Sequence, residues 1–215
     1  MLLKGILFDL DGVITDTATY HLKAWQHLAN LCNLTLDAAL ESQLKGVSRI
    51  DAFKLILAHN HSLDRFSQAQ IKQLCDDKND YYKSLIRNMT QDNILPGISE
   101  FLISCQKNKI KMAITSASFN APQLLDSIGL THYFDHIVDP ATLVRGKPDP
   151  DIFLKGAHAL GLLPSDCIGI EDAVAGIRAI NAAGSYSVGI GDKHALCEAK
   201  LVLPTTAALS LTLFT

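Results

Sequence analysis

The sequence predicts an α/β protein in which a doubly wound, Rossmann-like parallel sheet carries an inserted all-helical domain. Short continuous apolar runs, each suited to a strand buried on both faces, alternate with helical patterns over residues 92–215. Such alternation favours right-handed βαβ crossovers and a parallel sheet. Residues 16–91 carry helical patterns only. We therefore expect an α/β core of residues 1–15 and 92–215, interrupted by a helical domain of residues 16–91.

Length and composition exclude several classes of protein. The chain has 215 residues, of which 48% are hydrophobic and 19% charged, so it is too apolar for a disordered chain. Its net charge of -3 provides no basic field for a nucleic-acid backbone, and we expect no nucleic-acid partner. No apolar run approaches the roughly 18 to 20 residues of a membrane span, and aspartates interrupt the apolar N-terminus. We expect no membrane segment and no signal peptide.

The five cysteines indicate a reducing compartment. Their number is odd and no two are spaced as C-x-x-C, so we expect free thiols in a cytoplasmic protein. We also expect a monomer, because the sequence has no obvious exposed apolar stripe.

The first elements are a strand and a series of helices. Residues 5–8, Gly-Ile-Leu-Phe, form an apolar run that ends at Asp9. From residue 17 to about 32 the apolar positions follow the i, i+4, i+7, i+8 spacing of one helix face. Helical spacing continues to about residue 88, and no convincing strand occurs between 17 and 90.

After Pro96-Gly97 strands and helices alternate. The spacing i, i+3, i+4, i+7 over residues 98–105 predicts a helix. Three later helices are each followed by a glycine, which suits the left-handed residue after a helix. The expected elements are a strand at 111–115, a helix at 121–128, a strand at 136–138, a helix at 151–160, a strand at 167–170, a helix at 173–183, and strands at 187–190 and 201–203.

Polar residues directly after these strands indicate the site, because ligands of an open parallel sheet bind beyond the carboxyl ends of its strands. Four strand ends supply such residues. They are Asp9 and Asp11, then Ser116, Ser118 and Asn120, then Asp139 and Lys147, and finally Glu171 and Asp172. We expect one sheet edge to hold carboxylates, hydroxyls and one ammonium group.

Asp9 and Asp11 suit two complementary chemical roles. Side chains two apart in an extended chain lie on the same side, roughly 6 to 7 Å apart. One carboxylate is then available as nucleophile or metal ligand and the other as acid and base. The alternative is a pair of turn-forming aspartates before Gly12. A calcium-binding EF-hand loop is excluded, because Val13 and Ile14 stand at its fifth and sixth positions.

Glu171 and Asp172 add two carboxylates to the same edge. Their alternative role is to favour the start of the helix that follows. Together with Asp9 and Asp11, however, four acids would repel one another. A cation held by oxygen ligands relieves that repulsion, and Mg²⁺ is the natural choice where phosphate is also bound.

Ser116 and Lys147 suit phosphate. The Ser116 hydroxyl either caps the next helix or holds a phosphoryl oxygen. Lys147 does not belong to a Walker loop, because Ala141 and Pro148 stand where that motif needs Gly and Ser or Thr. As a point charge it suits a phosphoryl oxygen or a carboxylate, although a solvated lysine is the common alternative.

These motifs resemble the haloacid dehalogenase superfamily. Its four motifs are matched in order by Phe8-Asp9-Leu10-Asp11-Gly12-Val13, Thr115-Ser116, Lys147-Pro148 and Gly169-Ile170-Glu171-Asp172. The helical insertion after the first motif resembles the type 1 cap domain of that superfamily. Further matches are similar to its hexose-phosphate mutases. The resemblance implies substrate binding by Thr17, His21, Trp25, Lys45, Gly46, Val47, Ser48, Arg49, Lys78, Ser116, Ala117, Ser118, Asn120 and Lys147.

The resemblance also implies a mechanism. Asp9 becomes an aspartyl phosphate, Asp11 exchanges the proton of the sugar hydroxyl, and Ser116 and Lys147 neutralise phosphoryl oxygens. Mg²⁺ is implied as cofactor, held by Asp9, the Asp11 backbone carbonyl, Glu171 and Asp172. The implied substrates are the hexose phosphates β-glucose 1-phosphate and glucose 6-phosphate, with β-glucose 1,6-bisphosphate as intermediate.

Two departures and two alternatives accompany this resemblance. Phe119 stands where well-known members have a lysine that grips the non-reacting phosphate, and the tail after the last strand is short. One alternative function is a sugar-phosphate phosphatase, which shares every core residue and differs in its product. The other is a non-catalytic sugar-phosphate sensor, which has no need for the Asp9 and Asp11 pair.

Overall fold

The protein is described by a computed structural model that covers residues 3–44 and 47–214. Lys45 and Gly46, two of the expected substrate-binding residues, lie outside the described residues. The chain forms two compact units, Met1–Asp16 with Met89–Thr215, and Thr17–Asn88. From the sequence we expected the first unit to comprise residues 1–15 and 92–215. In the structure its first segment ends at Asp16 and its second segment begins at Met89. No helix in the described part of the chain is long and apolar enough to cross a membrane.

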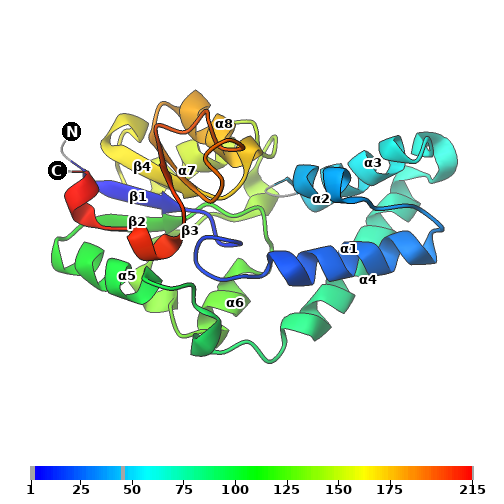
Figure 1. The fold of residues 1–215 in the computed structure, drawn as a ribbon, viewed down its shortest axis with the longest axis horizontal. Coiled ribbons are helices and arrows are strands. Elements are labelled where there is room, and N and C mark those ends of the chain that lie inside the picture. The colour runs from blue at the N-terminus through cyan, green and yellow to red at the C-terminus, as the bar shows by residue number, and fades with distance from the viewer. Residues whose placement is uncertain (1–2, 45–46, 215) are drawn as a thin grey trace. The chain divides into compact units, whose positions relative to one another are not determined.

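The first unit is built on a six-stranded sheet in the order β3-β2-β1-β4-β5-β6 (Figure 1). All neighbouring strands are parallel, which confirms the predicted doubly wound sheet. The strands are β1 (Gly5–Phe8), β2 (Lys111–Ile114), β3 (His136–Ile137), β4 (Cys167–Glu171), β5 (Tyr186–Ile190) and β6 (Leu201–Leu203). The central strand β1 is buried along its whole length, as its unbroken apolar run requires.

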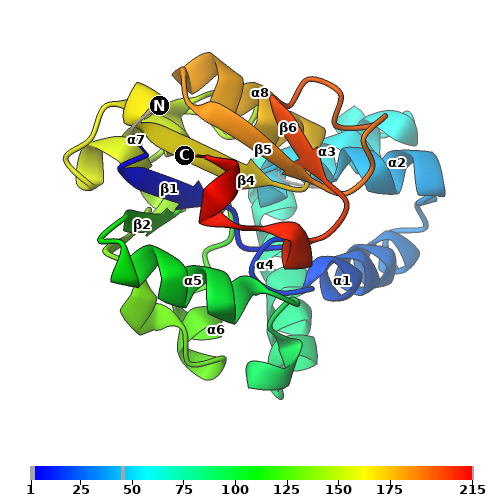
Figure 2. The ribbon, with the colours of Figure 1, turned by 60° about the vertical axis from the view of Figure 1, so that its left-hand side comes forward.

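Helices cover both faces of this sheet (Figures 1 and 2). They are α5 (Ile98–Lys107), α6 (Ala121–Ser127), α7 (Asp151–Ala159) and α8 (Val174–Ala183). The side chains of β1 alternate between the faces. Phe8 packs edge-on against Phe101 of α5, with ring centroids 6.2 Å apart, whereas Leu7 belongs to a buried cluster with Phe153 of α7 and Ile177 of α8.

The second unit is helical, as the sequence predicts. Its helices are α1 (Ala18–Leu31), α2 (Ala38–Gln43), α3 (Arg49–His59) and α4 (Gln68–Ile86). The apolar faces of α1 and α3 meet in a buried cluster in which Trp25 and Phe53 lie with near-parallel rings, 6.3 Å between centroids. Helix α4 begins with a capping box, in which the Ser67 side chain and Gln70 satisfy each other's backbone N–H groups.

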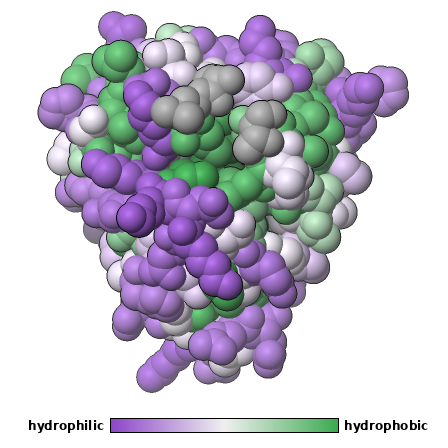
Figure 3. Space-filling view, turned by 90° about the vertical axis from the view of Figure 1, so that its left-hand side faces the viewer, coloured by the Kyte–Doolittle hydropathy of each residue, from purple (hydrophilic) through white to green (hydrophobic). Residues whose placement is uncertain are grey.

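The segment after β6 forms no α-helix in the described residues. After β6 the chain forms two short 3-10 helices, Thr206–Ala208 and Leu211–Leu213. Figure 3 faces the end of the molecule where β1 begins, and it shows apolar side chains gathered in its upper middle and mostly polar ones over its lower part. The carboxyl ends of β1 and β4 lie at the opposite edge of the sheet (Figure 1). The candidate site lies at these carboxyl ends.

Candidate active site

A buried ion triad lies where β1 and β4 end. Asp9 directly follows β1, and its backbone N–H donates to the carbonyl of Ile170 at 3.0 Å. Glu171 is the last residue of β4. Lys147 Nζ donates to Asp9 Oδ1 at 2.6 Å and to Glu171 Oε1 at 2.5 Å. Each of the three residues is at most 3% exposed, so the charges depend on one another for compensation.

This pairing shapes the protonation of the triad. Burial alone lowers the pKa of Lys147, but the charges and hydrogen bonds of Asp9 and Glu171 outweigh it and raise that pKa above its usual value. Burial raises the pKa of Glu171 well above its usual range, although the Lys147 charge opposes the shift. The Asp9 and Asp172 charges raise the pKa of Glu171 further. Burial and the neighbouring carboxylates thus outweigh the single ammonium of Lys147 in setting the pKa of Glu171.

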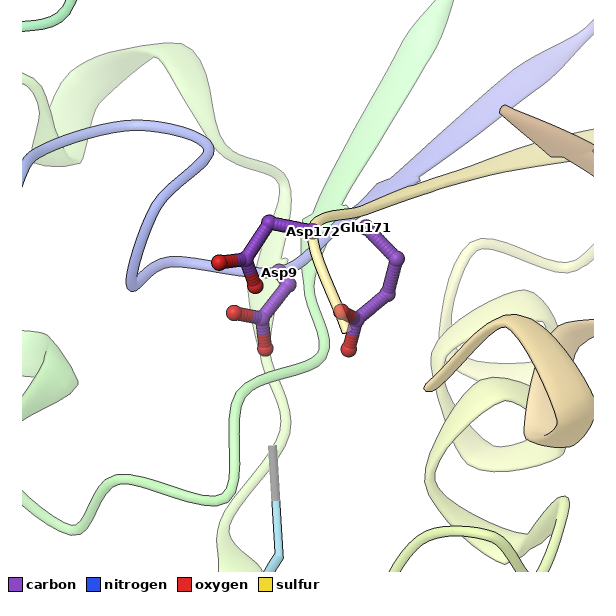
Figure 4. A group of neighbouring side chains, drawn as sticks. All are labelled: Asp9, Glu171 and Asp172. Atoms are coloured by element: carbon purple, nitrogen blue, oxygen red, sulfur yellow. The ribbon is translucent and has the colours of Figure 1, made fainter. Parts of the chain in front are cut away.

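Three carboxylates of this edge converge (Figure 4). Asp9, Glu171 and Asp172 each offer an oxygen, and these oxygens all lie within 4.8 Å of one another. Hard oxygen donors in this number and spacing could hold a divalent cation. Burial is the main cause of the raised pKa of Glu171, and the charges of Asp9 and Asp172 add to it; a bound cation would relieve that added repulsion.

Glu171 also contributes to the start of α8. Its Oε2 accepts the backbone N–H of Ala173, the N-cap residue, at 2.9 Å, while Oε1 is bound by Lys147. One oxygen of this carboxylate thus contributes to the helix start, as considered from the sequence, and the other pairs with Lys147.

Gly12 leaves room for the third carboxylate. Its φ of +80° lies in the left-handed region, and a Cβ built on it would overlap Oδ2 of Asp172 and lie 2.6 Å from its Cγ. Asp172 therefore packs directly against the backbone of the loop that follows β1.

We expect Gly12→Ala to lower both stability and metal affinity. The left-handed φ costs an alanine about 1 to 2 kcal/mol, and the new methyl group displaces the Asp172 carboxylate. Gly184→Ala is the matched control, because Gly184 has φ +81° and nothing within 4 Å of its Cβ position. Urea unfolding and calorimetric Mg²⁺ titration should show both losses for Gly12→Ala and only the stability loss for Gly184→Ala. Equal Mg²⁺ affinity in the two variants would contradict the packing described for Asp172.

The loop after β2 carries four of the residues expected to bind substrate, namely Ser116, Ala117, Ser118 and Asn120. Thr115 continues β2, and its N–H donates to the Phe8 carbonyl at 2.7 Å. Ser116 is 2% exposed, and its Oγ accepts the N–H of Ser118 at 3.1 Å. Ser116 does not cap α6, because the N-cap residue is Asn120. The loop continues through half-buried Ala117 and exposed Phe119.

Asp11 lies in the turn between β1 and the second unit. It is half-buried and forms an isolated bridge with Thr15, whose carbonyl accepts the N–H of Gly12 at 2.8 Å. The turn is held to the core by Thr15, whose hydroxyl donates to the carbonyl of Asn93 at 2.7 Å.

In the second unit a buried lysine lies in an aromatic cluster. Lys78 of α4 is 3% exposed, with Nζ 3.0 Å from His21 Nδ1 and 4.5 Å from the Trp25 ring centroid. The His21 ring stacks on Tyr82 at 4.0 Å. Burial, followed by the Lys78 and Arg49 charges, lowers the pKa of His21 well below its usual value. Tyr82 was not among the residues predicted from the sequence, although its place one helical turn after Lys78 was an available signal.

The other expected residues of this unit start helices. Arg49 is the first residue of α3, and its Nη1 lies 3.5 Å from Asp76 Oδ1. Ser48 caps that helix, since its hydroxyl accepts the Asp51 N–H at 3.2 Å and donates to the Asp51 carboxylate at 2.5 Å. Thr17 is buried before α1, and its carbonyl accepts the N–H of His21. Val47, just before Ser48, is half-buried.

Comparisons with known proteins found a matching family and similar chains. The family described as haloacid dehalogenase-like hydrolase matches residues 3–184. The chain is 42% identical to the β-phosphoglucomutase of Bacillus subtilis over 98% of this chain and 93% of the relative. It is 31% identical to the fructose-1-phosphate phosphatase YqaB of Escherichia coli over 86% of this chain and 95% of the relative. A crystal structure of the β-phosphoglucomutase of Clostridium difficile has a TM-score of 0.96 at 42% identity, covering 99% of this chain and 95% of that chain.

Proposed function

The chain belongs to the haloacid dehalogenase-like hydrolases, and from that membership we propose an isomerase that interconverts β-D-glucose 1-phosphate and glucose 6-phosphate. Identity of 42% to a β-phosphoglucomutase over nearly the whole chain is the observation that carries the choice of substrate. The buried pairing of Asp9 with Lys147 beside an acid cluster supports phosphoryl transfer as the reaction class.

We assign the nucleophilic role to Asp9. The reaction begins from enzyme whose Asp9 carries a phosphoryl group. In the first half-reaction Asp11 removes the proton of the free 6-hydroxyl of β-glucose 1-phosphate, the hydroxyl oxygen forms a bond to that phosphorus, and the bond from phosphorus to Asp9 breaks, which gives β-glucose 1,6-bisphosphate. In the second half-reaction the bisphosphate binds the other way round, and the Asp9 carboxylate forms a bond to the phosphorus of its 1-phosphate. The bond from this phosphorus to the sugar oxygen breaks, Asp11 gives that oxygen its proton, and glucose 6-phosphate is released. Lys147 holds Asp9 in place and, with Ser116, neutralises charge on the transferred oxygens.

Family membership implies a divalent metal, and we propose Mg²⁺. Its ligands would be Asp9, Glu171 and Asp172, whose oxygens converge, together with the Asp11 backbone carbonyl. When bound, the cation supplies positive charge that offsets the repulsion between the Asp9 carboxylate and a phosphate dianion. Only oxygen donors line this cluster among the described residues, which favours Mg²⁺ over softer metals.

The helical unit is proposed to serve as the cap domain that recognises the sugar phosphate. Arg49 is assigned to the distal phosphate, since a guanidinium can bind two phosphate oxygens at once. The remaining residues proposed to bind substrate in this unit are Thr17, His21, Trp25, Lys45, Gly46, Val47, Ser48 and Lys78. In the core unit they are Ser116, Ala117, Ser118, Asn120 and Lys147.

One assay tests the proposal. The purified protein is given Mg²⁺, β-glucose 1-phosphate and a trace of the bisphosphate, and glucose 6-phosphate and free phosphate are followed together. We expect glucose 6-phosphate to form in excess over phosphate. Phosphate as the main product would instead support the phosphatase alternative, which the fructose-1-phosphate phosphatase relative favours. A protein that forms neither product and is not phosphorylated on Asp9 would be the sensor.

Arg49→Lys is expected to raise KM for β-glucose 1-phosphate roughly tenfold, because the charge remains but the bidentate fork is lost. Arg49 lies 3.5 Å from Asp76, and a lysine keeps the positive charge of this pair. Arg65→Lys in the same unit is the control, since Arg65 lies over the Phe66 ring and has no proposed substrate contact. An Arg49→Lys enzyme with the KM of the wild type would remove Arg49 from the binding site.

We further propose a monomeric enzyme in the cytoplasm. All five cysteines are free, and four of them are buried. Burial raises the pKa of Cys105 to about 12 and of Cys75 to about 11, so both remain unreactive thiols. Sedimentation of the purified protein would test the assembly state.

A further inference from the structure

We propose that Gly176 is a positioning residue for the metal site, because the space left by its missing side chain is occupied by the Glu171 carboxylate. This inference extends the proposed function, since it concerns the ligand set of the proposed divalent cation. Gly176 touches no reacting atom, and it acts through Glu171.

The backbone brings Gly176 against Glu171. Strand β4 ends at Glu171, and α8 begins at Val174, so the first turn of the helix returns past the carboxylate. A Cβ built on Gly176 would overlap Oε1 and Cδ of Glu171 and lie 2.5 Å from its Cγ. Carbon atoms in favourable contact are about 3.5 to 4.0 Å apart. No alanine fits there while Glu171 keeps this position.

Glu171 cannot move aside without losing its partners. Glu171 is fully buried, its Oε1 accepts a hydrogen bond from Lys147 Nζ at 2.5 Å, and its Oε2 accepts the Ala173 N–H at 2.9 Å. A shift of the carboxylate breaks both contacts in a region from which water is excluded. It also withdraws an oxygen from the cluster with Asp9 and Asp172.

The helix itself gives no reason for a glycine at this position. The φ of Gly176 is not in the left-handed region, and alanine is the better helix former. Backbone considerations alone therefore predict that Gly176→Ala stabilises the protein. The close approach of Glu171 predicts the opposite outcome for the site.

Gly176 and Gly12 have the same role, because each leaves space that a carboxylate of the acid cluster occupies. Gly12 lies against Asp172 from the loop after β1, and Gly176 lies against Glu171 from the first turn of α8. The carboxylates of Glu171 and Asp172, at the end of β4, are thus each packed against the backbone of a glycine. Neighbouring glycines, as well as the acids, therefore determine where the oxygens converge.

The experiment is a calorimetric titration of metal-free protein with Mg²⁺, which requires no turnover. We expect Gly176→Ala to weaken Mg²⁺ binding at least tenfold. The double variant Gly176→Ala/Glu171→Ala should bind no more weakly than Glu171→Ala alone, because Glu171→Ala removes Oε1, Cδ and Cγ, the three atoms that the new methyl group would overlap. Gly156→Ala on α7 is the matched control, since its Cβ would crowd Thr115 and Leu7 in the core instead of a site carboxylate.

Several results would overturn the inference. They are wild-type Mg²⁺ affinity in Gly176→Ala, an equal loss of affinity in Gly156→Ala, and a loss in the double variant equal to the product of the two single losses. If Gly176→Ala does not fold, the inference requires that adding Glu171→Ala restores folding, as measured by thermal unfolding. Failure of the proposed function would give a different result, namely a wild-type protein that binds Mg²⁺ and forms no glucose 6-phosphate.

Discussion

Asp9→Asn is expected to lower turnover by at least about 10⁴-fold, because the reaction loses the atom that accepts the phosphoryl group. Phosphate-monoester chemistry is among the slowest in water, with enzymes supplying up to roughly 10²¹-fold, so no background path replaces the nucleophile. Asparagine keeps the shape of the side chain and one acceptor for Lys147, which lies 2.6 Å from Asp9. The measurements are steady-state turnover and covalent phosphate on the protein after mixing with substrate.

Asp166→Asn is the matched control for this prediction. Asp166 is a partly exposed aspartate of the same unit, paired with Lys4 at the surface at 3.1 Å. Its loss should leave turnover near that of the wild type. More than a few per cent of wild-type turnover in Asp9→Asn, or covalent phosphate on that variant, would refute the nucleophilic role of Asp9.

Lys147→Met is expected to lower the free energy of unfolding by roughly 3 to 5 kcal/mol, the range for removing one partner from a buried ion pair. The variant leaves Asp9 and Glu171, both nearly fully buried, without their shared counter-charge. Turnover should fall as well, because the Lys147 charge no longer balances the phosphoryl oxygens. Urea unfolding without metal gives the first quantity, and adding Mg²⁺ should recover part of the loss.

The effect of Lys147→Met should depend on pH in a defined direction. Burial already raises the pKa of Glu171 in the presence of Lys147, and removing the ammonium raises it further. A carboxyl whose pKa is higher in the folded than in the unfolded state loses stability as pH rises between the two values. The deficit of the variant should therefore shrink as pH falls. Lys4→Met, which removes only an exposed ion pair, should cost less than about 1 kcal/mol.

Local pattern predicted most of the fold. The apolar run of β1 and the spacing of Ile98, Phe101, Leu102 and Cys105 on α5 each identify their element without distant residues, and both are buried as expected. Helix α2 was not predicted separately, because its six residues are too few to show a period. Strand β3 proved shorter than expected, at two residues.

The candidate site was predictable in kind but not in detail. That polar residues after four strands gather at one edge follows from parallel topology, and the oxygens of Asp9, Glu171 and Asp172 do converge. The sequence did not indicate that Lys147 bridges two of these acids, or that Tyr82 stacks on His21. The roles assigned to these residues in catalysis and substrate binding remain predictions.

The sequence by itself determined the order of strands and helices, the family and the chemical groups available at one edge of the sheet. Periodicity and motif are properties of neighbours in the chain, so they can be read without coordinates. Only the tertiary structure decided which groups pair, because Lys147 and Asp9 are 138 residues apart and meet through the packing of the whole sheet. The same holds for Gly176, whose importance depends on a carboxylate folded back over the first turn of α8.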